Sequence, residues 1–155
     1  MRSAPLLLAG VLLSVAACAS PPHSTDAASA PTVAAPVCPD TLPPHPMAGP
    51  ASPMVPGDPA TAVACNYGSA GSPRLAKSVK VADAKALAVA LNSSDTAPPP
   101  RGTMCPMDQG TTDLVIFAYP KGDPVYVTVK PGGCATATNG TAKAYRLTST
   151  VLDKL

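Results

Sequence analysis

Most of the reactive chemistry of this 155-residue chain lies in five cysteines: Cys18, Cys38, Cys65, Cys105 and Cys134. A cysteine thiolate is a nucleophile and a metal ligand, and two cysteines can join as a disulfide. Neither a C-x-x-C motif nor a nearby histidine pair accompanies these residues, so the pattern favours disulfides over a zinc or redox site. The last four cysteines allow three pairings into two disulfides, and Cys18 is then the fifth cysteine, which needs its own explanation.

Side chains that suit soft metal ions form a second group: His45, Met47, Met54, Met104 and Met107. Thioethers suit Cu(I), and a copper site would form if the segment around Cys105 packed against the segment between Cys38 and Cys65. Methionines also fill irregular gaps around prolines and disulfides, and this second interpretation is favoured. We therefore expect no cofactor and keep copper handling as the first alternative function.

Hydrolysis by a nucleophilic side chain requires a base beside the nucleophile. The two histidines, His23 and His45, lie in proline-rich stretches that are poorly suited to hold a base in place, and the chain contains no G-x-S-x-G, S-x-x-K or glycine-rich phosphate loop. Asp108 and Asp113 could pair for acid–base work, but short acids beside Gly110 are typical turn residues. We expect a non-catalytic protein, with a hydrolase of unrecognised type as the second alternative.

The first 17 residues have the pattern of a secretory signal peptide. Arg2 precedes an apolar run from Ala4 to Ala17, which at about 14 residues is shorter than the roughly 20 that span a bilayer as a helix. A charged start, a short apolar middle and small residues at the end are typical of this class of segment. The sequence therefore predicts an exported protein.

The stretch Val15-Ala16-Ala17-Cys18 resembles the lipobox of bacterial lipoproteins. The resemblance implies cleavage after Ala17, a diacylglyceryl group on Cys18 and attachment to the extracytoplasmic side of the cell membrane. Two acyl chains are enough for stable anchoring. The alternative is ordinary cleavage that releases a secreted protein, which would leave an odd thiol in an oxidising compartment.

Composition divides the rest of the chain into a linker and one small domain. Residues 18–37 are expected to form a lipidated N-terminus and a disordered linker, because alanine, proline and serine bury too little apolar surface to offset the entropy of ordering. The formal net charge is +2 and no basic stripe is present, which argues against nucleic acid as a partner. Residues 38–155 follow as an extracytoplasmic domain.

The pattern of residues 38–155 predicts an α+β fold with antiparallel hairpins and two short helices. The stretch DLVIFAYPKGDPVYVTVK alternates as two strands, and pairing residues whose numbers sum to 244 gives one apolar and one mixed face. Shorter strands are expected over 63–67, over 75–81 and on both sides of Asn139-Gly140. Asp83 is a good N-cap for a helix that buries one face: Ala84, Leu87, Ala88 and Leu91. A closing helix should bury a last apolar set: Leu147, Val151, Leu152 and Leu155.

The register of this hairpin also favours one of the three cysteine pairings. It brings Cys134 opposite residue 110, near Cys105, so a Cys105–Cys134 bridge is favoured and Cys38–Cys65 follows by elimination. Loops of about 27 and 29 residues would each contribute about 3.5 kcal/mol if disulfides act by restricting the unfolded chain. The proline-rich segment between Cys38 and Cys65 would then be fastened to the first strand.

Several short stretches resemble those of a group of uncharacterised actinobacterial secreted proteins and lipoproteins: ACNY, ALNS, MCPMDQG, LVIFAYPKGD, GGCATATNG and LDKL. The resemblance covers about 60% of the chain, from Cys65 to Leu155, and implies an architecture and a location but no activity. The sequence thus favours a lipid-anchored binding domain of the cell envelope, whose partner is an envelope protein or a small ligand.

Overall fold

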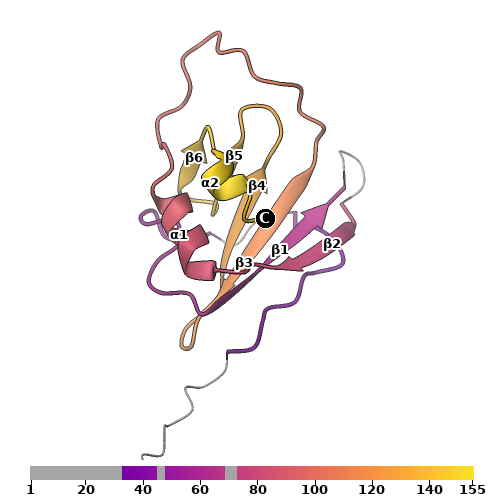
Figure 1. Ribbon diagram of the computed structural model, residues 1–155, viewed down its shortest axis with the longest axis vertical. Coiled ribbons are helices and arrows are strands. Elements are labelled where there is room, and N and C mark those ends of the chain that lie inside the picture. The colour runs from indigo at the N-terminus through magenta and orange to yellow at the C-terminus, as the bar shows by residue number, and fades with distance from the viewer. Residues whose placement is uncertain (1–32, 45–47, 69–72) are drawn as a thin grey trace, which may run out of the picture.

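The computed structural model describes residues 33–44, 48–68 and 73–155. Within these residues the chain forms one antiparallel sheet of six strands in the order β2-β1-β3-β4-β5-β6 (Figure 1). The strands are β1 (Thr61–Tyr67), β2 (Leu75–Lys80), β3 (Thr112–Ala118), β4 (Val125–Lys130), β5 (Thr136–Thr138) and β6 (Lys143–Tyr145). Two short helices accompany the sheet: α1 (Ala84–Asn92) between β2 and β3, and α2 (Ser149–Leu152) after β6.

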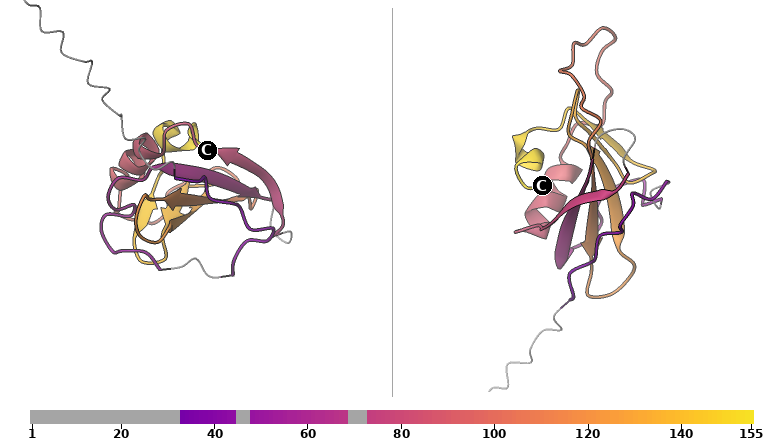
Figure 2. Two further views of the ribbon diagram at one scale, coloured as in Figure 1. Left: turned by 90° about the horizontal axis from the view of Figure 1, so that it is seen from below. Right: turned by 90° about the vertical axis from the view of Figure 1, so that its right-hand side faces the viewer.

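Both faces of the sheet are covered, by different parts of the chain. Helices α1 and α2 lie over one face, here called the helix face, and the N-terminal stretch that begins at residue 33 crosses the other, here called the N-terminal face (Figure 2). Because successive side chains of a strand point to opposite faces, the central strands β1 and β3 supply both cores. The helix face carries the larger core, which includes Ala62, Ala64, Leu87, Leu91, Val115, Phe117, Val127 and Val129. The N-terminal face carries the smaller one: Cys38, Val63, Cys65, Tyr67, Leu114 and Ile116.

The hairpin of β3 and β4 has the predicted faces but not the predicted register. Val115 pairs with Val127 and Phe117 with Val125, so paired numbers sum to 242 rather than 244. The error is a slip of two residues, and an even slip leaves every side chain on its original face. The face expected to be mixed is also buried near β1, because Leu114 and Ile116 are only 1% and 3% exposed.

Helix α1 has the predicted N-cap and the predicted buried face. The carboxylate of Asp83 accepts a hydrogen bond of 2.9 Å from the backbone N–H of Ala86, which satisfies one of the free donors of the first turn. The buried residues are those that the spacing predicts: Ala84, Leu87, Ala88 and Leu91. On the outer side of the helix, Val89 remains 65% exposed.

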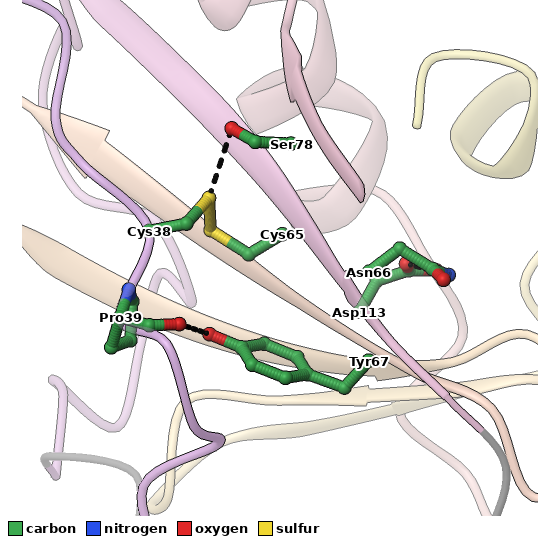
Figure 3. The surroundings of a disulfide bond; sticks show 7 residues. All are labelled: Cys38, Pro39, Cys65, Asn66, Tyr67, Ser78 and Asp113. Atoms are coloured by element: carbon green, nitrogen blue, oxygen red, sulfur yellow. Dashed lines mark hydrogen bonds between the residues drawn. A yellow bond between two sulfur atoms is a disulfide. The ribbon is translucent and has the colours of Figure 1, made fainter. Parts of the chain in front are cut away.

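The proline-rich N-terminal stretch is tied to the N-terminal face by a disulfide and by hydrogen bonds. Cys38 and Cys65 form the bridge favoured by the sequence, with 5.6 Å between their Cα atoms (Figure 3). The hydroxyl of Ser78 donates to Sγ of Cys38 over 3.2 Å, and the hydroxyl of Tyr67 donates to the carbonyl of Pro39 over 2.8 Å. The segment therefore serves as the cover that the buried side chains of β1 and β3 require.

Asn139, between β5 and β6, holds the next stretch, residues 48–55, against the edge of the sheet opposite β2. This side chain is fully buried, and its Nδ2 donates to the carbonyls of Pro50 and Met54 over 2.8 and 2.9 Å. Gly49 lies so close to it that a Cβ there would stand 2.6 Å from Nδ2 of Asn139, so only glycine fits. Asn139 therefore does more than form the turn that its Asn-Gly sequence predicts.

Two expectations about helices need correction. The helices supply only nine and four residues, so the domain is mostly β and the α+β label describes it only loosely. The closing helix is shorter than predicted, because the backbone of Thr148 is extended and the helix begins only at Ser149. Leu147 is nevertheless buried ahead of the helix, and Val151 is buried within it.

The signal peptide, Cys18 and most of the expected linker lie outside the described residues. Residues 33–37 of the linker have no regular secondary structure, and Val37 is 86% exposed. No helix in the described part of the chain combines the length and the apolar character needed to cross a bilayer.

The two sides of α1 give a direct test of the helix-face core. Leu87→Ala should lower the free energy of unfolding by about 2–5 kcal/mol, because it removes a fully buried side chain and leaves a cavity. Val89→Ala, on the exposed side of the same helix, should change it by less than about 0.5 kcal/mol. Urea denaturation measures both. Equal losses in the two variants would contradict the assigned packing of α1.

Candidate functional site

The long connection between α1 and β3, residues 93–111, is the most exposed part of the described chain and is called the distal loop here. It extends beyond the sheet at one end of the molecule (Figure 1). Every residue from Pro100 to Gln109 is exposed, and the side chains of Met104 and Met107 are 92% and 89% exposed. The distal loop thus holds two large apolar side chains open to solvent.

The distal loop is fixed to the sheet at several points despite its exposure. Cys105 and Cys134 form the second disulfide favoured by the sequence, with 5.0 Å between their Cα atoms. Near it, the loop lies directly on Gly132, because a Cβ there would stand 2.4 Å from Oδ1 of Asp108 and 3.2 Å from its Cα. At the start of the loop, the carbonyl of Asp95 accepts from the backbone N–H of Tyr145 over 2.7 Å, and its carboxylate pairs with Arg146.

The described chain begins at the opposite end of the sheet from the distal loop. The carbonyl of Ala34 accepts a hydrogen bond of 3.5 Å from the hydroxyl of Thr61, and Thr61 pairs with Ala118 at one end of the central strands. The distal loop runs into Thr112, which pairs with Tyr67 at the other end. Seven residues of strand separate the two ends by about 20 Å. The right-hand view of Figure 2 shows this polarity.

A second candidate site is a row of three polar side chains across the helix face of the sheet. Lys77 of β2 pairs with Asn66 of β1, and Asn66 pairs with Asp113 of β3. Nδ2 of Asn66 donates to Oδ1 of Asp113 over 2.7 Å. Asp113 is only 7% exposed, and its burial raises the pKa of the carboxyl group while the hydrogen bond from Asn66 partly opposes the rise.

The polar row forms one wall of a cavity of about 260 Å³. Leu152 of α2 and Leu155 line the opposite side, and Pro131 closes the end nearest β4. Asn66, Lys77 and Asp113 are joined there by Ala64 and Val79 of the sheet. The cavity therefore combines a charged and polar floor with apolar walls, which is the usual composition of a small-molecule site.

The two aspartates considered for acid–base work have different partners. Oδ1 of Asp108 accepts from the backbone N–H of Gly110 over 2.8 Å, as the turn interpretation predicts. Asp113 is not a turn residue: it lies within β3 and is hydrogen bonded to Asn66. The signal that could have identified it is alternation, because Asp113 shares a face with Val115 and Phe117, where an aspartate is out of place.

The residues considered for copper binding have dissimilar surroundings. Met54 is 5% exposed within the helix-face core, whereas Met104 and Met107 are open to solvent on the distal loop. His45 and Met47 lie outside the described residues. In the part of the chain that the structure covers, no group of three or more histidine, cysteine, aspartate or glutamate side chains could hold a metal ion.

Comparison with known proteins gives no match: no family model, no curated protein and no solved structure resembles the chain closely enough to be reported. The distal loop and the cavity beside Asp113, here called the Asp113 cavity, are thus considered as candidate sites on their own geometry. Both lie toward the end of β1 that is away from Ala34.

The raised pKa of Asp113 predicts a pH-dependent cost to stability. Since the folded-state pKa lies above the unfolded one, the folded protein binds the proton more tightly, and the free energy of unfolding falls as the pH rises through that interval. Asp113→Asn removes this titration and keeps an acceptor for Asn66. The variant should be at least as stable as the wild type at pH 7, with a flatter stability profile above pH 4.

Urea denaturation between pH 3 and pH 8 measures this difference. Asp108→Asn makes the same change at an exposed position and serves as the matched control for the substitution. A lower free energy of unfolding at pH 7 in Asp113→Asn than in the wild type would mean that the charged carboxylate stabilises the fold. That result would contradict the interpretation of Asp113 as a binding residue whose burial destabilises the fold.

The second disulfide should control the order of the distal loop. In Cys105→Ser/Cys134→Ser the loop loses its covalent attachment, so trypsin should cut after the exposed Arg101 several times faster than in the wild type. Cleavage after Lys121, in the turn at the other end of the sheet, provides an internal control and should not change. Equal cleavage rates after Arg101 would show that the loop is ordered without the bridge.

Proposed function

We propose that this protein is a lipid-anchored extracytoplasmic binding domain that presents its distal loop to a protein of the cell envelope. The observation that carries the proposal is the pair of exposed methionines, Met104 and Met107, on a loop that a disulfide holds in place. Ordering an apolar loop in advance reduces the entropy that binding would otherwise cost. The domain needs no catalytic group for this role.

The cysteine count supports attachment through Cys18. Two disulfides use Cys38, Cys65, Cys105 and Cys134, which leaves Cys18 as the fifth cysteine. An acylated Cys18 removes the odd thiol from an oxidising compartment and agrees with the lipobox at Val15–Cys18. Residues 18–37 then act as the linker to the membrane.

The polarity of the domain supports the distal loop as the recognition surface. A linker that reaches the domain near Ala34 leaves the opposite end of β1 free to face away from the membrane. Pro98, Pro99 and Pro100 stiffen the rising limb of the loop, because each proline ring fixes its own φ angle. The loop therefore projects from the free end of the domain with little conformational freedom to lose.

Fatty-acid labelling in the native host tests the anchor. The wild-type chain should incorporate labelled palmitate and sediment with membranes, whereas Cys18→Ser should do neither. Cys105→Ser, which removes a cysteine of the folded domain, should still be labelled and serves as the control. An unlabelled wild-type chain in the soluble fraction would contradict the lipoprotein assignment.

Crosslinking in intact cells tests the distal loop. A partner crosslinked to the wild-type chain should be lost in Met104→Asp/Met107→Asp, because the substitutions add charge to two exposed side chains without touching either core. Val89→Asp adds a charge to the exposed side of α1 and should retain the partner. A partner retained by the double variant, or absent from the wild type, would contradict the proposal.

A further inference from the structure

We propose that the Asp113 cavity binds a small zwitterion with an α-ammonium group, a carboxylate and an apolar side chain, as in a free aliphatic amino acid. This site is separate from the distal loop and rests on different observations. In the proposed complex the ammonium group contacts Asp113, the carboxylate contacts Lys77 and the side chain packs against Leu152 and Leu155.

Asp113 supplies an acceptor that the fold leaves without a cation. Its carboxylate is almost fully buried, yet its side-chain partner in the described chain is the neutral amide of Asn66. Lys77 belongs to the same row, but the structure has no ion pair between Lys77 and Asp113. A buried carboxylate without a cationic partner is costly, and a ligand ammonium group would remove that cost.

Lys77 supplies the opposite charge at a suitable separation. It lies two strands away from Asp113, and strands spaced about 4.8 Å apart put their backbones about 9.6 Å from each other. Two charge-assisted hydrogen bonds of about 2.8 Å, with about 3 Å between the ammonium nitrogen and a carboxylate oxygen of an α-amino acid, span roughly 9 Å along the sheet. The flexible Lys77 side chain can adjust to this span, so an α-amino acid, whose two charged groups are attached to one carbon, fits between the two residues.

The walls and the size of the cavity limit the rest of the ligand. Leu152, Leu155 and Pro131 offer apolar contacts beside the polar row, Val79 adds one from the sheet itself, and no aromatic side chain is among the lining residues. The volume of about 260 Å³ is slightly below the usual range of small-molecule sites, about 300–1,000 Å³, so only a single small molecule fits. A branched aliphatic side chain suits these walls, whereas a peptide would extend beyond them.

Three related probes test the two charges separately: leucine, leucinamide, which lacks the carboxylate, and N-acetylleucine, which lacks the ammonium group. Titration calorimetry of the full chain in detergent should show saturable binding of leucine and binding at least about tenfold weaker for each of the other two. Binding of leucinamide as tight as that of leucine would overturn the assignment to Lys77. Binding of N-acetylleucine as tight as that of leucine would overturn the assignment to Asp113.

Variants on the same strands complete the test. Asp113→Asn, which is expected to fold, and Lys77→Ala should each weaken leucine binding at least about tenfold. Lys80→Ala removes the same charge from β2 on the opposite face, since Lys80 pairs with Val63 of the N-terminal-face core, and should bind leucine as the wild type does. Absence of leucine binding to the wild type, or unchanged binding to Asp113→Asn, would overturn the proposal while leaving the distal-loop proposal intact.

Discussion

The structure depends on one constraint: the central strands β1 and β3 are buried on both faces. Their backbones pair on both sides, and five of the seven residues in each are buried. Helices alone cannot satisfy this requirement, because α1 and α2 lie over one face only. The proline-rich N-terminal stretch covers the other, and the Cys38–Cys65 bridge holds it there in place of the large apolar surface that the stretch lacks.

This arrangement also determines where the N-terminal stretch, the distal loop and the Asp113 cavity lie. Covering β1 on its N-terminal face brings Ala34 to one end of the strand, so the distal loop and its disulfide occupy the other. On the helix face, the short helices leave part of β1, β2 and β3 uncovered beside α2, and the row of Lys77, Asn66 and Asp113 opens into that space. A binding surface and a polar cavity thus arise at positions that the core does not use.

Local signals in the sequence predicted much of this fold. The N-cap at Asp83 and the two faces of the β3–β4 hairpin were accessible from spacing alone. Both disulfides followed from an approximate hairpin register and from elimination. The exact hairpin register was not accessible, because a slip of two residues preserves the alternation on which the prediction rested. Burial of Leu114 and Ile116 was missed because their cover is rich in proline rather than in apolar residues. The contact of Asn66 with Asp113 joins residues 47 positions apart and needs the pairing of β1 with β3, which no local pattern encodes.

The constraint on β1 is tested most directly by amide hydrogen exchange of the full chain, compared between the wild type and Cys38→Ala/Cys65→Ala. If the bridge holds the cover of the N-terminal face, the double variant should lose protection at Leu42 and Leu75, whose N–H groups donate to Pro73 and Asp40, and then along β1. Protection at Leu42, Leu75 and β1 equal to that of the wild type would contradict this account, because the N-terminal stretch would then stay in place without the disulfide.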